Sequence, residues 1–131
     1  PTAVAGMILK TNGGVPGGTG AERATPEQCA QATLQCLRRT VPAAVPGIYF
    51  LSGGQDEVTA TANLNAINAS LHTQCWVLSF SYGRALQTTA LNEWRGAAAN
   101  TTIAQHALYR RARLNGAARA GRYHAAMENE N

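Results

Sequence analysis

Charge is scarce in this sequence, and lysine is nearly absent. Charged residues make up 14% of the 131 positions, and ten of the eleven basic residues are arginine. The one lysine is Lys10. Arginine stays protonated at working pH, whereas a desolvated lysine can act as an amine nucleophile. Biased codon use could also explain why lysine is so rare. Composition alone therefore makes Lys10 a candidate functional residue and no more.

Long hydrophobic runs are also missing. No apolar run reaches the roughly 18 residues that a membrane-spanning helix needs, and residues 1–6 lack the basic start of a signal peptide. Hydrophobic residues nevertheless make up 45% of the chain, which is typical of globular proteins and argues against disorder. We therefore expect a soluble globular protein with no membrane partner.

Paired cysteines and metal-binding spacings are absent as well. The three cysteines, Cys29, Cys36 and Cys75, include no C-x-x-C pair, and an odd number favours reduced thiols. Neither cysteines nor histidines have the short spacing of a zinc site, so we expect no metal. The pattern predicts a cytoplasmic protein, with an organellar copy as the alternative.

The formal net charge of +4 comes partly from arginines near the end of the chain. These are Arg110, Arg111, Arg113, Arg119 and Arg122. They fall in a segment with helical periodicity and few aromatic neighbours. We interpret them as a solvated helix face rather than as a nucleic-acid site.

The chain repeats one plan three times: a short apolar run, a glycine-containing turn and a helical stretch. These βα units lie around 4–40, 47–69 and 75–120, and a polar tail follows at 121–131. The expected strands are 4–9, 47–51 and 75–80. The expected helices are 25–39, 56–68, one from 84 onward and 101–120.

Capping residues and apolar spacing support these helices. Thr25, Pro26 and Gln28 form the sequence pattern of a capping box with proline at the first helical position. The expected buried positions are Ala60, Leu64 and Ile67 in the second helix and Ile103, Leu108 and Leu114 in the last one.

Short strands that are apolar on both faces and alternate with helices predict an α/β fold with a parallel sheet. Two architectures fit this pattern, a doubly wound sheet or part of a (β/α)8 barrel. Three units cannot close a barrel, which takes eight. The pattern therefore predicts that part of the fold is missing from this chain, or that the chain packs against something else.

Two loops after consecutive strands carry candidate phosphate-binding groups. Residues 52–54 read S-G-G and offer consecutive backbone N–H groups with no Cβ in the way. Residues 81–84 read S-Y-G-R, where an arginine in a first helical turn opposes the helix dipole unless an anion is bound. Loops after neighbouring strands meet at one edge of a parallel sheet, so we expect them to form one site.

Lys10 follows the first apolar run and would point into the mouth of this site. A neutral amine there could attack a ketone to give an iminium, which serves as an electron sink for carbon–carbon bond cleavage. The alternative is a lysine at a strand end that reaches into solvent.

Five stretches of the sequence resemble the class I fructose-bisphosphate aldolases. They are G-M-I-L-K at 6–10, R-R-T-V-P-A-A-V-P-G-I at 38–48, F-L-S-G-G-Q at 50–55, N-L-N-A-I-N at 63–68 and S-F-S-Y-G-R-A-L-Q at 79–87. The first resembles the family's G-T-L-L-K segment around its Schiff-base lysine. The likeness extends to about Tyr123.

This resemblance implies that the chain is strands six to eight of a (β/α)8 TIM barrel with their helices. It implies that Lys10 forms the Schiff base, and that the groups around the C1-phosphate of the ketose are Ser52, Gly53, Gly54, Ser81, Gly83 and Arg84. The implied reaction is cleavage of fructose 1,6-bisphosphate to dihydroxyacetone phosphate and glyceraldehyde 3-phosphate, without a metal or other cofactor. The implied partners are the sugar bisphosphate, the remainder of the barrel or another chain, and copies of itself in a homotetramer.

The sequence also departs from the family. Residues 11–14 read T-N-G-G where the family has P-N-M-V, and Ala5 and Met7 replace a glutamate and a threonine. The family's acid–base carboxylates and its C-terminal tyrosine have no counterpart here. We therefore expect the isolated chain to be inactive, and a non-catalytic, aldolase-like subunit of a larger assembly stays open as the alternative.

Overall fold

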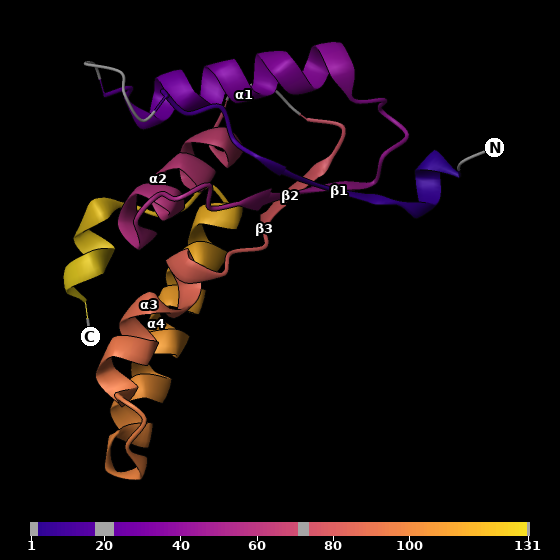
Figure 1. Cartoon of the computed structure of the whole chain (residues 1–131). Coiled ribbons are helices and arrows are strands. Elements are labelled where there is room, and N and C mark those ends of the chain that lie inside the picture. The colour runs from indigo at the N-terminus through magenta and orange to yellow at the C-terminus, as the bar shows by residue number, and fades with distance from the viewer. Residues whose placement is uncertain (1–2, 18–22, 71–73, 131) are drawn as a thin grey trace.

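Three parallel strands form one sheet, and helices connect them (Figure 1). The computed structural model describes residues 3–17, 23–70 and 74–130. The strands, in sheet order, are β1 (Ile8–Asn12), β2 (Gly47–Leu51) and β3 (Val77–Phe80). The helices are α1 (Pro26–Thr40), α2 (Glu57–Asn68), α3 (Arg84–Trp94) and α4 (Thr101–Arg119). Short 3-10 segments are η1 (Val4–Gly6), η2 (Ala98–Asn100) and η3 (Ala125–Asn129). This is the predicted α/β alternation with a parallel sheet.

One face of the sheet belongs to the hydrophobic core. Residues paired across a parallel sheet point to the same face, so Leu9, Ile48 and Leu78 form one row. Ile48 is fully buried and Leu78 is buried. Both pack with apolar residues of the helices, among them Leu34 of α1 and Leu64 of α2. The helices therefore cover this face.

The opposite face of the sheet is open. Its apolar side chains are exposed: Ile8 by 53%, Leu51 by 38% and Val77 by 49%. Lys10 lies on this face too, because it alternates with Leu9 along β1 and is exposed. A sheet with one covered face and one open apolar face agrees with part of a barrel, in which the open face would point inward.

The first strand differs from the prediction of 4–9. Residues Val4–Gly6 form the 3-10 turn η1, and β1 runs on past Lys10 to Asn12. The register explains the shift, because Ile8 pairs with Gly47 at the start of β2. Pro46 precedes Gly47 and has no N–H with which to extend the ladder. The third strand is also shorter than predicted, beginning at Val77 instead of Cys75.

Helices α1 and α2 begin at side-chain caps. Thr25 accepts a hydrogen bond from the Gln28 N–H at 3.3 Å, and Gln28 Oε1 accepts one from the Thr25 N–H at 2.9 Å. The predicted capping box is confirmed. Asp56 accepts hydrogen bonds from the backbone of Val58 and Thr59 at 3.0 and 2.9 Å. The Thr59 hydroxyl also donates to Asp56. Hydrogen bonds to the charged carboxylate lower the pKa of Asp56, and the bond from this hydroxyl has the largest effect.

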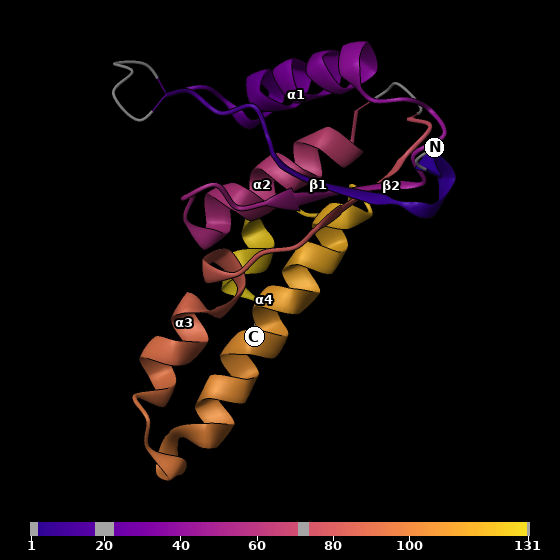
Figure 2. The same ribbon diagram turned by 45° about the vertical axis from the view of Figure 1, so that its right-hand side comes forward.

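Helices α3 and α4 pack side by side and extend away from the sheet (Figures 1 and 2). Leu114, toward the end of α4 nearer the sheet, is fully buried as predicted. The same prediction is wrong for Ile103 and Leu108, which are 51% and 40% exposed. Both belong to the first half of α4, the half that lies away from the sheet and beside α3 (Figure 2). No helix of the described residues is long and apolar enough to cross a membrane.

The described part of the C-terminal segment, 121–130, folds back onto α2 and α4. The Tyr123 N–H donates a 2.9 Å hydrogen bond to Asn65 of α2, and its ring is buried. Gly121 allows this close approach. Its φ is +67°, and a Cβ there would lie 3.2 Å from the backbone of Ala69.

Candidate phosphate and lysine site

The loops after β2 and β3 meet at the carboxyl edge of the sheet, as expected of neighbouring parallel strands. The Ser81 N–H donates a 2.8 Å hydrogen bond to the Phe50 carbonyl, so the second loop leaves β3 beside the end of β2. The structure thus brings the two predicted phosphate loops to the same edge. Whether their residues bind phosphate stays a prediction.

The first loop, Ser52 to Gln55, is a tight turn that needs two glycines. The Gln55 N–H donates to the Ser52 carbonyl at 3.0 Å, and Gly53 and Gly54 have φ of +58° and +81°. A Cβ on Gly53 would also lie 3.3 Å from Asn12 Oδ1. Both glycines are exposed, and no acceptor among the described residues takes their N–H groups. These donors can face an anion.

The Gln55 side chain supports this turn from behind. Its Nε2 donates to the Ser52 carbonyl at 2.7 Å, and its Oε1 accepts from Asn63 of α2 at 2.6 Å. We did not single out Gln55 or Asn63 from the sequence. The glutamine directly after S-G-G was the available signal, because an amide can donate to the turn while accepting from the next helix.

The second loop leads into a helix whose N-terminus has no side-chain cap. Gly83 is the N-cap of α3, and no side chain accepts a hydrogen bond from the first turn. The first helical residue, Arg84, is exposed. Uncapped N–H groups, a positive helix end and a guanidinium together form a setting that suits a phosphate.

Tyr82 anchors the second loop to α2. Its hydroxyl donates a 2.9 Å hydrogen bond to the Ala60 carbonyl, and its ring contacts that of Phe80 with centroids 5.4 Å apart. Burial raises the pKa of Tyr82 because the phenolate would lose its hydration. The sequence analysis missed this anchor within S-Y-G-R.

Lys10 lies further from the loop edge than predicted. It is the middle residue of β1 and pairs with Tyr49, two positions before the last pair, Asn12 with Leu51. At about 3.3 Å per residue its Cα lies about 7 Å below that edge. The prediction that Lys10 ends its strand is wrong, because Thr11 and Asn12 also pair with β2 and prolong β1. Its side chain points to the open face instead.

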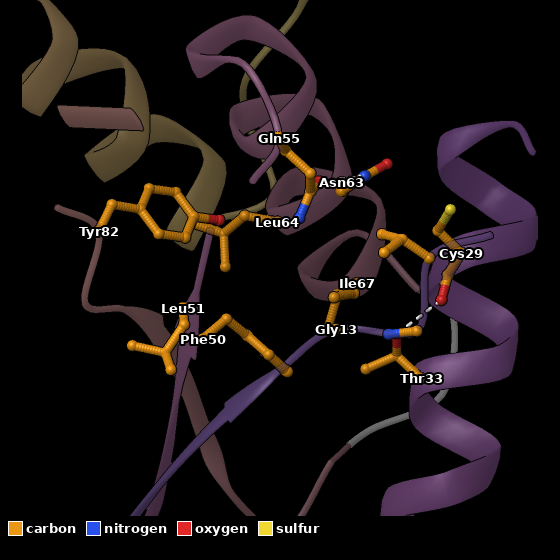
Figure 3. Close-up of a pocket in the computed structure, with 12 residues that line it drawn as sticks. Gly13, Cys29, Thr33, Phe50, Leu51, Gln55, Asn63, Leu64, Ile67 and Tyr82 are labelled. Atoms are coloured by element: carbon orange, nitrogen blue, oxygen red, sulfur yellow. Dashed lines mark hydrogen bonds between the residues drawn. The ribbon is translucent and has the colours of Figure 1, made fainter. Parts of the chain in front are cut away.

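A small cavity lies where the three loops converge (Figure 3). Its volume is about 10 Å³, room for roughly one water molecule. Gly13, Gln55 and Tyr82, which follow β1, β2 and β3 respectively, each contribute to its lining. The Gly14 N–H donates to Thr33 Oγ1 of α1 at 2.7 Å and so attaches the first loop. A sugar phosphate cannot fit inside, so a substrate would have to lie over the exposed loops.

The acidic side chains near this edge already have partners. Asp56 caps α2, and Glu57 accepts hydrogen bonds from Thr89 and Arg111. Among the residues that the structure describes, no group of three His, Cys, Asp or Glu could hold a metal ion. The described part of the chain therefore brings one lysine and the two predicted phosphate loops to the same sheet, but no unengaged carboxylate beside them for proton transfer.

Arg111 corrects the interpretation of the C-terminal arginines as a solvated face. It is only 5% exposed and binds Glu57 at 3.2 Å and Glu128 at 2.8 Å. Burial alone would lower the pKa of Arg111, but the two carboxylates raise it. Helical spacing alone could not distinguish this arginine from its exposed neighbour Arg113.

The family model for "Glycolytic: Fructose-bisphosphate aldolase class-I" matches residues 2–131. Among curated proteins, the chain is 50% identical over 123 residues to "Fructose-bisphosphate aldolase C" of Homo sapiens, covering 94% of this chain and 34% of that protein. It is 52% identical over 118 residues to "Fructose-bisphosphate aldolase 2" of Caenorhabditis elegans, covering 90% and 32%. The chain thus spans about a third of the length of these relatives.

A solved structure with a similar fold is an aldolase from Plasmodium falciparum "in complex with TRAP and a small molecule inhibitor". The two share 45% sequence identity with a TM-score of 0.87, over 90% of this chain and 34% of that one. The family model, the curated relatives and this fold likeness all point to one family.

Proposed function

This chain belongs to the class I fructose-bisphosphate aldolase family, and we propose that it supplies the imine-forming lysine and the phosphate site of an aldolase. In this reaction, fructose 1,6-bisphosphate is cleaved to dihydroxyacetone phosphate and glyceraldehyde 3-phosphate. The observation that carries the proposal is spatial. Lys10 lies on the open face of the sheet, and the two predicted phosphate loops lie at the carboxyl edge above it.

Lys10 is proposed to act as the nucleophile. Its amine attacks the ketone carbon of the substrate, and loss of water leaves an iminium. A base from the remainder of the protein would take the proton of the C4 hydroxyl as the carbon–carbon bond breaks. The bond electrons then flow into the iminium, and the aldehyde product is released. Hydrolysis of the remaining enamine, after protonation, releases dihydroxyacetone phosphate and restores the lysine.

The loops are proposed to hold the C1-phosphate beside this lysine. Ser52, Gly53 and Gly54 would donate hydrogen bonds from one loop, and Ser81, Gly83 and Arg84 would bind from the other. Arg84 can hold two phosphate oxygens at once, which fixes orientation as well as charge. Binding energy at the phosphate would thereby orient the ketone toward Lys10.

We propose that β1, β2 and β3 are strands six to eight of a (β/α)8 barrel. The open apolar face and the coverage of about one third of the relatives support this arrangement. The remaining strands, from the same protein or another chain, would then supply the groups for proton transfer. A cytoplasmic location is proposed on the free state of Cys29, Cys36 and Cys75. A homotetramer is proposed on family resemblance.

A second candidate is a non-catalytic, aldolase-like subunit of a larger assembly. The observation that favours it is the engagement of the carboxylates near the loop edge, where Asp56 caps α2 and Glu57 binds Arg111. Without carboxylates from elsewhere, general acid–base catalysis would be missing. This candidate predicts phosphate binding without turnover.

A cleavage assay separates the two candidates. The protein that contains this chain should release glyceraldehyde 3-phosphate from fructose 1,6-bisphosphate, and Lys10→Met should abolish the release. A matched control is Arg113→Ala, an exposed site on α4 away from the loops, which should keep full activity. Turnover that survives Lys10→Met contradicts the proposed nucleophile, and phosphate binding without turnover favours the second candidate.

A further inference from the structure

A partly buried ion cluster lies where α2, α3, α4 and the C-terminal segment meet. We call Arg111, Glu57 and Glu128 the Arg111 cluster. Arg111 donates to Glu128 at 2.8 and 2.9 Å and to Glu57 at 3.2 Å. It also donates to Thr61 Oγ1 at 3.2 Å. None of these side chains belongs to the site described above.

Glu57 connects this cluster to both phosphate loops. It is the first helical residue of α2, three positions after Gly54. Its Oε1 accepts a 2.9 Å hydrogen bond from Thr89 of α3, the helix that begins at Arg84. Among the described residues, this is the one side-chain hydrogen bond between α2 and α3. The same oxygen accepts from Arg111 of α4.

From these contacts we infer that Glu57 is a positioning residue for the phosphate site. It holds the first turn of α2 against α3, and thereby sets the spacing between the Ser52–Gly54 turn and the N-terminus that carries Arg84. The inference rests on the proposed function, because it assumes that the two loops bind one phosphate together. Glu57 itself does not touch the substrate.

The negative charge of Glu57 allows a positioning role to be distinguished from a purely electrostatic effect on phosphate affinity. A carboxylate near a phosphate repels it, so removing the carboxylate should tighten phosphate binding if charge alone matters. A loss of positioning has the opposite sign, because the two loops no longer present their donors to the same oxygen atoms. The Arg111 guanidinium offsets the charge of Glu57. The effect of Glu57 on the spacing of the two loops should therefore outweigh its repulsion of phosphate.

The experiment measures inorganic phosphate binding by calorimetry in the complete protein that contains this chain. Glu57→Leu keeps a similar volume and removes both the charge and the oxygen that accepts from Thr89 and Arg111. Glu27→Leu is the matched control, since Glu27 lies in the first turn of α1 and is exposed. Thr89→Val tests the same contact from the other side without changing any charge. Melting temperatures and borohydride trapping with dihydroxyacetone phosphate accompany each binding curve.

We expect Glu57→Leu to weaken phosphate binding about fivefold or more, within the range of coupling between sites, and Glu27→Leu to change it less than twofold. Thr89→Val should weaken it about two- to threefold. At saturating ligand, trapping on Lys10 should be unchanged in all three variants. A purely structural role would lower the melting temperature and leave phosphate affinity unaltered.

Two results overturn the inference in different ways. Equal or tighter phosphate binding by Glu57→Leu, with normal binding by the unmodified protein, rejects the positioning role and leaves the proposed function standing. No phosphate binding by the unmodified protein rejects the phosphate site, and the inference falls with it. If Glu57→Leu does not fold, unchanged affinity in Thr89→Val rejects the positioning role.

Discussion

Lys10 lies directly across from Tyr49 in the parallel register of β1 and β2, on the face of the sheet that no helix among the described residues covers. The side chain therefore does not share the core with Leu9 and Ile48, its neighbours on the other face. Chemistry at Lys10 would take place over the open face, between the exposed side chains of Ile8 and Asn12. Whatever completes the fold must cover this face to exclude water from an iminium.

Arg84 should carry a large part of phosphate affinity. Arg84→Ala is expected to weaken binding of inorganic phosphate by roughly 10- to 100-fold, because hydrogen bonds to charged groups contribute about 1.5–3 kcal/mol. Arg84→Lys keeps the charge but loses the planar guanidinium, so its phosphate affinity should lie between those of the unmodified protein and Arg84→Ala. Calorimetric titration measures both. An affinity that is unchanged in Arg84→Ala, with Arg113→Ala as control, would remove Arg84 from the site.

Gly53 is required by backbone geometry as well as by space. Gly53→Ala would place a Cβ at a φ of +58° and 3.3 Å from Asn12 Oδ1, so unfolding free energy should fall by about 1–2 kcal/mol. Gly116 offers the opposite case, since it lies within α4 with no atom within 4 Å of its added Cβ. Gly116→Ala should raise stability by about 0.5–1 kcal/mol. Urea denaturation measures the unfolding free energy of both variants. Equal changes in the two variants would contradict the turn geometry at Gly53.

Removing Arg111 should destabilise the protein more than removing any exposed arginine. Arg111→Ala leaves Glu57 and Glu128 without their shared cation, a loss of about 3–5 kcal/mol for a buried pair that is broken on one side. Arg113→Ala, two residues further along the same helix but exposed, should change stability by less than about 0.5 kcal/mol. Thermal or chemical denaturation compares the two. Similar losses in both variants would mean that Arg111 is not buried in solution.

Much of the fold was readable from local chemistry. Thr25, Pro26 and Gln28 fixed the start of α1 through a capping box that the structure contains, and the run 47–51 matched β2 at both ends. These elements depend on neighbours within a few residues, which a sequence displays directly. The likeness to one family then supplied the order of the units.

The predictions that failed concern strand pairing between distant residues and the burial of side chains in the folded protein. The end of β1 was misplaced because Asn12 pairs with Leu51, a contact that no local pattern encodes. Ile103 and Leu108 had the spacing of a buried face, but α4 extends beyond the sheet at that point. Arg111 looked like its neighbours because its partners lie 54 positions earlier, at Glu57, and 17 positions later, at Glu128.

Stability should depend on pH through Glu128. Burial alone would raise the pKa of Glu128, but the hydrogen bonds from Arg111 and Tyr123 and the nearby arginine charges lower it overall. A folded pKa below the unfolded value of about 4.3 means that the unfolded chain takes up the proton first. The stabilisation is therefore complete above about pH 5 and is lost as the pH falls through the folded pKa.

Glu128→Gln should flatten this acid dependence. Unfolding free energy measured between pH 7 and pH 3 should fall less steeply in the variant than in the unmodified protein, and the two should converge at the acid end. Glu130→Gln serves as control because Glu130 is exposed in the same segment. A slope in Glu128→Gln equal to that of the control would show that the Arg111 cluster does not hold Glu128 in its charged form.

Borohydride reduction in the presence of dihydroxyacetone phosphate tests the central claim most directly. Lys10 is the only lysine between residues 1 and 131, so a trapped side-chain adduct within this chain maps to one position. Reduction of the complete protein, followed by peptide mass mapping, should find the adduct on the peptide that contains Lys10 and lose it in Lys10→Met. An unmodified Lys10 at saturating ligand, in protein that binds phosphate normally, would contradict the assignment of Lys10 as the Schiff-base residue.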